Sequence, residues 1–368
     1  MRALELAVDP RLRDPDLRCE KVNPTISESF DMPGLQLAQE TVPPRETEHT
    51  NDLIARIKAK MRTDYPAGIM RRDAHPKMHG AVMAEFIVEP DLPAEFRIGV
   101  FKEPKTYRAW IRFSNGAGSI KPDSCRDIRG MAIKLMGVPG KKLLSQEQDE
   151  TTHDFILATA NVFFIKDMRE MDAAAKAITG SLFAKIRFGL THLRVGWLFL
   201  KTNLKCANPL KVRYFSTTPY LFGADCAVKY AATPLFKTPD PLPGAPSDDY
   251  LRLALAGHLK HGEARFDFSL QFQTDPDAMP IEHAGREWRE SVSPFRKVAT
   301  IRIFKQDCDN DKQVQFGENL SFTPWHALPE HRPLGGINRG RKLVYEAISA
   351  FRHQYNGVAR REPDSWDI

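Results

Sequence analysis

The sequence predicts an α+β protein built on an eight-stranded antiparallel β-barrel with helices around it. Eight segments of strand length alternate between apolar and polar residues or are continuously apolar. They fall into two groups of four, and helical periodicity occupies the intervals between and after them. Because a barrel of eight antiparallel strands can just enclose one ligand, we expect a ligand inside this barrel.

The predicted strands begin after Arg72 and are separated by turn residues. The first group occupies residues 80–89, 107–114, 129–137 and 154–160, and the second group occupies residues 212–217, 226–232, 264–273 and 298–306.

Helices are predicted before, between and after the strands, at residues 51–65, 164–179, 182–205 and 248–262. The segment 182–205 combines large apolar residues with basic ones such as Lys185, Arg187 and Lys201. Two interpretations of it stay open. It is a basic amphipathic helix that lies on an anionic membrane surface, or an ordinary packing helix whose basic side faces solvent.

The chain divides into three predicted parts. Residues 1–60 form an extended arm followed by a helix, since the first 50 residues are rich in proline and polar residues and show little periodicity. Residues 61–356 form the barrel domain, with a helical insertion around residues 165–262. Residues 357–368 form a tail.

Charge and composition exclude some function classes. The formal net charge is +6, which we expect to be spread along the chain. No recognition motif for DNA or RNA is present, so we expect no nucleic-acid partner. A mild positive charge suits an anionic small molecule or an anionic membrane surface.

Cysteine usage and hydropathy predict a cytoplasmic protein, with peripheral membrane contact under the first interpretation of residues 182–205. The five cysteines are scattered and form no C-x-x-C pair, which argues against a disulfide framework and a zinc site. The first residues lack the continuous apolar core of a secretory signal. No run of 18 apolar residues is present, so we expect no transmembrane span.

Residues 338–353 are predicted to form an amphipathic helix that carries a candidate metal ligand. At about 100° per residue, Arg341, Tyr345 and Arg352 project within roughly 40° of one another at the edge of the apolar arc. Two cations beside a phenol favour the phenolate. A phenolate is a hard anionic ligand suited to ferric iron, and tyrosine can ligate haem. The alternative is an Arg/Tyr pair on a solvated helix face.

Residues suited to peroxide chemistry precede the first strand. His75 can exchange protons near neutral pH, and Arg72 beside it can neutralise a propionate. We expect His79 to be structural.

The second strand carries a further candidate. Arg112 alternates in phase with Trp110 and Ser114, so the three share one face of the strand. If that face points into the barrel, the buried guanidinium needs an anionic partner. The alternative is an arginine on the surface.

Five blocks together resemble the haem-dependent catalase family in order and spacing. They are Arg72-x-x-His75-x-Lys77, Arg112-Phe113-Ser114, Arg126-Asp127-x-Arg129-Gly130-x-Ala132, Phe163-Phe164-Ile165-Lys166-Asp167, and Gly340-Arg341-x-x-x-Tyr345 with Arg352 seven residues later. The resemblance covers roughly residues 60–356. The likeness is nearest to the short bacterial catalase-related proteins and the catalase-like allene oxide synthases, through residues 214–223 and 274–282.

The resemblance implies a haem b cofactor enclosed in the barrel. It implies that Tyr345 is the axial iron ligand, assisted by Arg341, that His75 is the distal acid/base, and that Ser114 supports His75. The residues that would contact the propionates or the porphyrin are Arg72, Arg112, Arg352, Phe163 and Phe164.

The sequence departs from the family pattern on the distal side. Where catalases carry a distal asparagine, this chain has Ala158, with Thr159 beside it and Asn161 three residues later. Thr159 is therefore a candidate for the catalytic role. Losing the amide withdraws a donor from bound peroxide, which weakens chemistry on hydrogen peroxide. Ala74 stands where an allene oxide synthase would be expected to carry threonine.

These features predict a haem enzyme that acts on organic, lipid-derived hydroperoxides, as a peroxidase or by rearranging or cleaving them. Two alternatives stay open. One is dismutation of hydrogen peroxide, and the other is a haem-binding carrier or sensor without turnover. Besides the hydroperoxide, we expect the chain to bind its own copies as a homodimer or homotetramer.

Overall fold

The computed structural model describes residues 36–236 and 240–368. The arm predicted for the first 50 residues therefore falls mostly outside the described residues. Its described end is attached to the barrel domain, because the backbone N–H of Thr41 donates to Glu282 Oε1 at 3.0 Å and that of Ala38 donates to Gln273 Oε1 at 2.8 Å.

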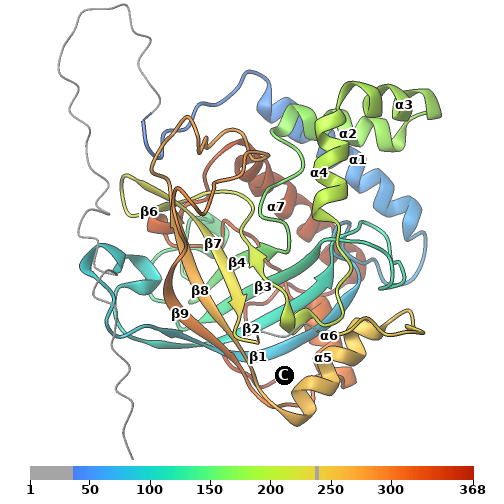
Figure 1. Ribbon diagram of the computed structural model, residues 1–368. Helices are drawn as coiled ribbons and strands as arrows, with labels where there is room; N and C mark the ends of the chain where they lie inside the picture. Colours follow the sequence, from blue (N-terminus) through green and yellow to red (C-terminus); the bar gives the residue numbers. More distant parts are fainter. Residues whose placement is uncertain (1–35, 237–239) are drawn as a thin grey trace, which may run out of the picture. The chain divides into compact units, whose positions relative to one another are not determined.

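The strands form one antiparallel sheet that closes on itself (Figure 1). In the described residues they are β1 (Met78–Val88), β2 (Thr106–Asn115), β3 (Arg129–Met136), β4 (Thr152–Ala158), β5 (Tyr214–Phe215), β6 (Tyr220–Phe222), β7 (Cys226–Pro234), β8 (Ala264–Phe272) and β9 (Arg296–Ile303).

Eight of these strands make the ring. β9 pairs with β1, and β5 pairs with both β4 and β7, which closes the barrel. The closing strand is short, since β5 has only two residues. β6 pairs with β7 outside the ring and was not predicted. The predicted fold class, α+β with an eight-stranded antiparallel barrel, is confirmed.

The barrel interior is a packed apolar core. Phe268 contacts Phe86 and Phe155 with ring centroids 5.0 and 4.9 Å apart, and Tyr230 packs on Phe155 at 5.0 Å. All four side chains are at most 1% exposed. An eight-stranded barrel is just wide enough for its own side chains, and here they fill it. The expectation of a ligand inside the barrel, haem included, was therefore wrong.

The helices lie outside the barrel (Figure 1). They are α1 (Glu46–Asp64), α2 (Met168–Thr179), α3 (Leu182–Thr191), α4 (Leu193–Thr202), α5 (Tyr250–His261), α6 (Asp311–Asn319) and α7 (Gly336–Asn356). The helix predicted over residues 182–205 is two helices that meet at His192, where the backbone leaves helical geometry (φ −127°, ψ 47°). α6 was not predicted.

Within the described residues, no helix combines the length and the apolar character needed to cross a bilayer. Cys125, Cys206 and Cys308 are free thiols, whereas Cys226 is disulfide-bonded, so the expectation of a chain without disulfides was wrong for Cys226.

Candidate functional site

A pocket lies between the outer face of the barrel and α7. It holds about 890 Å³ of space, counted with its open mouth. The barrel side is made by Arg112, Ala132 and Ile156, which the strand register places next to one another on β2, β3 and β4. Along each strand, these residues alternate with the residues whose side chains fill the barrel. α7 supplies Tyr345 and Ile348 from the other side.

Tyr345 lines this pocket together with a neighbouring cation. Arg341, one helical turn earlier on α7, donates from Nη2 to the Tyr345 hydroxyl at 3.1 Å. Burial alone would lower the pKa of Arg341, but the phenols of Tyr345 and Tyr220 raise it above its ordinary value. The guanidinium therefore stays charged and stabilises negative charge on the Tyr345 oxygen.

His75 lines the same pocket from the barrel side. Its Nδ1 hydrogen-bonds to Ser114 Oγ at 2.9 Å, and Arg112 Nη2 donates to the His75 carbonyl at 3.0 Å. The backbone of His75 is left-handed (φ 60°), a strained conformation for a residue with a Cβ. Burial, followed by repulsion from Arg112, lowers the pKa of His75 to about 3. The imidazole is neutral at physiological pH.

Three arginines that line the pocket converge on Glu318, two on its carboxylate and one on its backbone carbonyl. Arg72 lies 3.4 Å and Arg112 lies 3.6 Å from Glu318, and Arg352 donates to the Glu318 carbonyl at 2.8 Å. Glu318 was not predicted as a site residue, because the apolar pattern of α6, which carries it, is too short to predict a helix. The sequence feature that could have identified it is the acidic residue itself, which lies in the segment that leads to α7.

This cluster has more positive charge than its surroundings neutralise. Burial and then repulsion from Arg72 lower the pKa of Arg112 and bring that of Arg352 to about 9. Arg112 Nε is buried and donates no hydrogen bond in the described structure. An unpartnered buried donor and excess positive charge both favour an anionic ligand.

The donors present fit a haem group. A hard phenolate oxygen with an assisting arginine suits ferric iron, and the cluster of three arginines suits two carboxylates. The wall between them is apolar, because Ala132 and Ile156 line the pocket and Gly130 beside them has no side chain.

The structure places the remaining predicted site residues elsewhere. Thr159 is not among the pocket residues, and its hydroxyl accepts from the Arg129 backbone N–H at 3.0 Å. Asn161 donates to Glu287 at 2.6 Å, in a separate small pocket. Phe163 and Phe164 stack on each other with centroids 5.4 Å apart and do not line the main pocket. Their predicted roles stay predictions.

Among the comparisons with known proteins, the matches come from solved structures. No protein-family model and no curated protein matches the chain. A fungal catalase structure superposes with a TM-score of 0.58 at 17% sequence identity, over 89% of this chain and 66% of that one. A bacterial catalase gives a TM-score of 0.59 at 17% identity, over 80% and 59%. The chain has the catalase fold.

At this identity the likeness establishes the fold alone. The chain also spans only about two thirds or less of the length of these two catalases. Catalytic roles for the side chains of the pocket, and a substrate, must therefore be inferred from the geometry of the pocket.

Close packing against Gly130 of this catalase-like barrel fixes the position of the His75 ring. A Cβ on Gly130 would lie 2.6 Å from His75 Nδ1 and 2.9 Å from Ser114 Oγ. Gly130→Ala is therefore expected to displace the imidazole while leaving Tyr345 in place. We expect turnover per bound haem to fall about 100-fold, the usual effect of a misplacement of about 1 Å. Gly257→Ala, where the added carbon meets nothing within 4 Å, is the matched control. Equal rates for the two variants would contradict this placement of His75.

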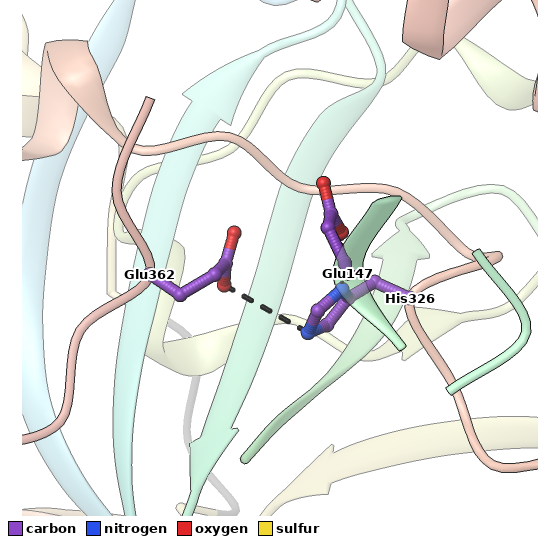
Figure 2. Close-up of side chains that lie close together, drawn as sticks. All are labelled: Glu147, His326 and Glu362. Carbon is purple, nitrogen blue, oxygen red and sulfur yellow. Dashed lines mark hydrogen bonds and ion pairs between the residues drawn. The ribbon is translucent and has the colours of Figure 1, made fainter. Parts of the chain in front are cut away.

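A second cluster, outside the pocket, resembles a metal site but is a salt-bridge network. Glu147, His326 and Glu362 offer ligand atoms within 4.8 Å of one another (Figure 2). However, cations already occupy both carboxylates: Lys134 lies 2.5 Å from Glu362 and Arg360 lies 2.5 Å from Glu147. We therefore assign it a structural role, which is to attach residues 357–368 to the outside of the barrel.

We expect the stability of the fold to depend strongly on Lys134, which belongs to this network. Its Nζ is fully buried between Asp154 at 2.7 Å and Glu362 at 2.5 Å. Lys134→Met leaves two buried carboxylates without their cation, which costs about 3 to 5 kcal/mol of unfolding free energy. Chemical denaturation at pH 7 measures this loss of unfolding free energy. Lys141→Met, at an exposed position, is the control.

The pH dependence of this effect has a definite sign. Burial opposes ionisation of Glu362, but Lys134 and His326 lower its pKa to about 2. In the native protein this stabilisation is present above the ordinary glutamate pKa and is lost as pH falls toward 2. The difference between Lys134→Met and the native chain should therefore shrink below about pH 4. No difference at pH 7 would show that the network does not stabilise the fold.

Proposed function

We propose that the protein is a haem-dependent enzyme that consumes organic hydroperoxides, including those of fatty acids. The observation that carries this proposal is that His75, Ser114 and Tyr345 line one pocket, with Arg341 bonded to the Tyr345 hydroxyl. Three arginines that line the same pocket converge on Glu318.

The chain's residues have separate roles in binding haem. Tyr345 would ligate the iron, and Arg341, at 3.1 Å from its oxygen, stabilises the phenolate. Arg72, Arg112 and Arg352 would hold the propionates. Bound haem supplies a ferric centre at which the oxygen–oxygen bond of a hydroperoxide is cleaved.

His75 moves the proton. Because its pKa is lowered to about 3, the imidazole is neutral and able to take the hydroperoxide proton. Ser114 holds Nδ1 at 2.9 Å, which leaves Nε2 as the nitrogen that faces the substrate. The same nitrogen then returns the proton to the departing oxygen.

The distal wall favours organic hydroperoxides over hydrogen peroxide. Neither Thr159 nor Asn161 is among the residues that line the pocket, so within the described part of the chain no side-chain amide supplements His75 as a donor to a small peroxide. Ile156, Val344 and Ile348 also line the pocket, and their partly exposed side chains offer apolar contact to a carbon chain.

Comparing substrates tests the proposal. Steady-state rates of the haem-loaded full-length chain would be measured with hydrogen peroxide and with linoleic acid hydroperoxide. We expect a higher kcat/KM for the lipid hydroperoxide. Equal or faster use of hydrogen peroxide would indicate a catalase activity instead, and haem binding without consumption of either peroxide would indicate a carrier or sensor.

A further inference from the structure

The helices α3 and α4 together expose a large apolar surface. Leu182, Phe183 and Leu190 of α3 are 73%, 75% and 70% exposed, and Leu193 and Trp197 of α4 are 71% and 60% exposed. No side chain of α3 is buried, although all of its residues are described. Contiguous apolar surface of this kind marks an interaction site, whereas scattered exposed residues do not.

The exposed apolar residues of α3 form one stripe with a cation on each side. At about 100° per residue they fall within an arc of about 100°. They are Leu182, Phe183, Ile186 and Leu190. Lys185 lies about 60° beyond one edge of this arc, and Arg187 lies about 40° beyond the other. Long basic side chains in this position can keep their charge at a polar surface while the stripe is buried.

α4 has two apolar faces, and the fold uses only one. Val195 and Leu198 are buried against the protein, at 7% and 6% exposure. Leu193, Trp197 and Leu200 point to the other side of the helix and are exposed. Lys201 lies over the Trp197 ring at 5.2 Å. Packing among the described residues 36–236 and 240–368 therefore does not explain the apolar outer face of α4.

The positive charge of the chain is concentrated in this region. Residues 173–224 contain eight lysines and arginines and no aspartate or glutamate, whereas the rest of the chain has 45 basic and 47 acidic residues. The expectation of an evenly spread charge was wrong. Among the described residues, Lys185, Arg187 and Lys205 have no ion-pair partner, so their charges are available to an anionic partner.

We propose that the α3–α4 pair docks on the surface of an anionic lipid bilayer. The apolar stripe enters the boundary between headgroups and acyl chains, and the flanking cations contact lipid phosphates. A second copy of the chain is a poorer occupant. In a symmetric contact the same patch meets itself, so cations would face cations with no acid in the patch to neutralise them.

The docking surface adjoins the pocket wall. Phe188, on the inner side of α3, packs on the same apolar cluster as Ile57 and Val344. Ile57 and Val344 also line the pocket. A chain docked through α3 and α4 thus holds the pocket close to lipid. The inference does not rest on haem or on any reaction, because the test reads lipid binding alone.

Vesicle co-sedimentation of the full-length chain tests the proposal. Phosphatidylcholine vesicles with and without phosphatidylglycerol are the probes. We expect binding only to the phosphatidylglycerol vesicles, weakening as salt is added. Phe183→Asp with Leu190→Asp, and separately Lys185→Glu with Arg187→Glu, should each weaken partitioning about tenfold or more. Leu253→Asp and Lys260→Glu, exposed positions on α5, are the matched controls.

Two results would overturn the proposal. One is a native chain that stays in the supernatant with phosphatidylglycerol vesicles at low salt. The other is a lipid-free dimer, detected by analytical ultracentrifugation, that Phe183→Asp with Leu190→Asp dissociates, since the patch would then be occupied by a second copy. Circular dichroism of each variant confirms that it is folded. Neither result bears on haem binding in the pocket.

Discussion

Tyr345→Phe is expected to abolish stable haem binding. The change removes one oxygen, and with it the only phenolic group among the described residues that line the pocket. Arg341 then loses its 3.1 Å partner, and the iron loses an anionic ligand that the helix presents in fixed geometry. Haem retained after gel filtration, together with the ferric absorption spectrum, measures the effect.

Tyr355→Phe is the matched control for this substitution. Tyr355 lies on the same helix, is 41% exposed, and donates its hydroxyl to the Tyr65 carbonyl at 3.1 Å. It should bind haem like the native chain. A Tyr345→Phe protein with native haem content and an unchanged spectrum would remove Tyr345 as the ligand.

His75→Ala is expected to retain haem and to lose most hydroperoxide cleavage. General acid/base catalysis of this kind contributes about 100-fold to 10,000-fold in rate. His261→Ala, an exposed histidine at the end of α5, is the control. Turnover per haem is the measurement, and a His75→Ala protein as fast as the control would contradict the acid/base role.

The pH profile of the native chain gives a second measure of His75. Burial and Arg112 keep its pKa at about 3, so the reactive neutral imidazole is the dominant form at all higher pH. We expect no inflection from this residue between about pH 5 and 8, where an ordinary histidine titrates. An inflection near pH 6.5 that disappears in His75→Ala would show that haem binding raises this pKa.

Strand and helix periodicity predicted most of the fold. Seven of the eight ring strands and α7 were found because each repeats its apolar residues at the period of its element. The short β5 and β6 have too few residues to establish a period. α6 was missed for the same reason, and Glu318 with it. The break at His192 was missed because apolar residues continue through it.

The sequence predicted which residues form the site better than it predicted where the site lies relative to the barrel. Arg341 and Tyr345 are one helical turn apart, so the helix alone brings them together. Arg112 and Ser114 were correctly placed on one strand face, but whether that face points into the barrel was left open. Ile111 and Phe113, at the alternate positions, are wholly apolar and are the residues that fill the barrel. Thr159 was assigned by alignment to a family position, and its hydroxyl instead bonds to neighbouring backbone.

A crystal structure of the chain loaded with haem would show directly where the porphyrin lies. We expect the porphyrin between the outer face of β2–β4 and α7, with Tyr345 Oη bonded to iron, His75 on the opposite face, and the propionates on Arg72, Arg112 and Arg352. Iron bound through any other side chain, or a porphyrin outside this pocket, would contradict it.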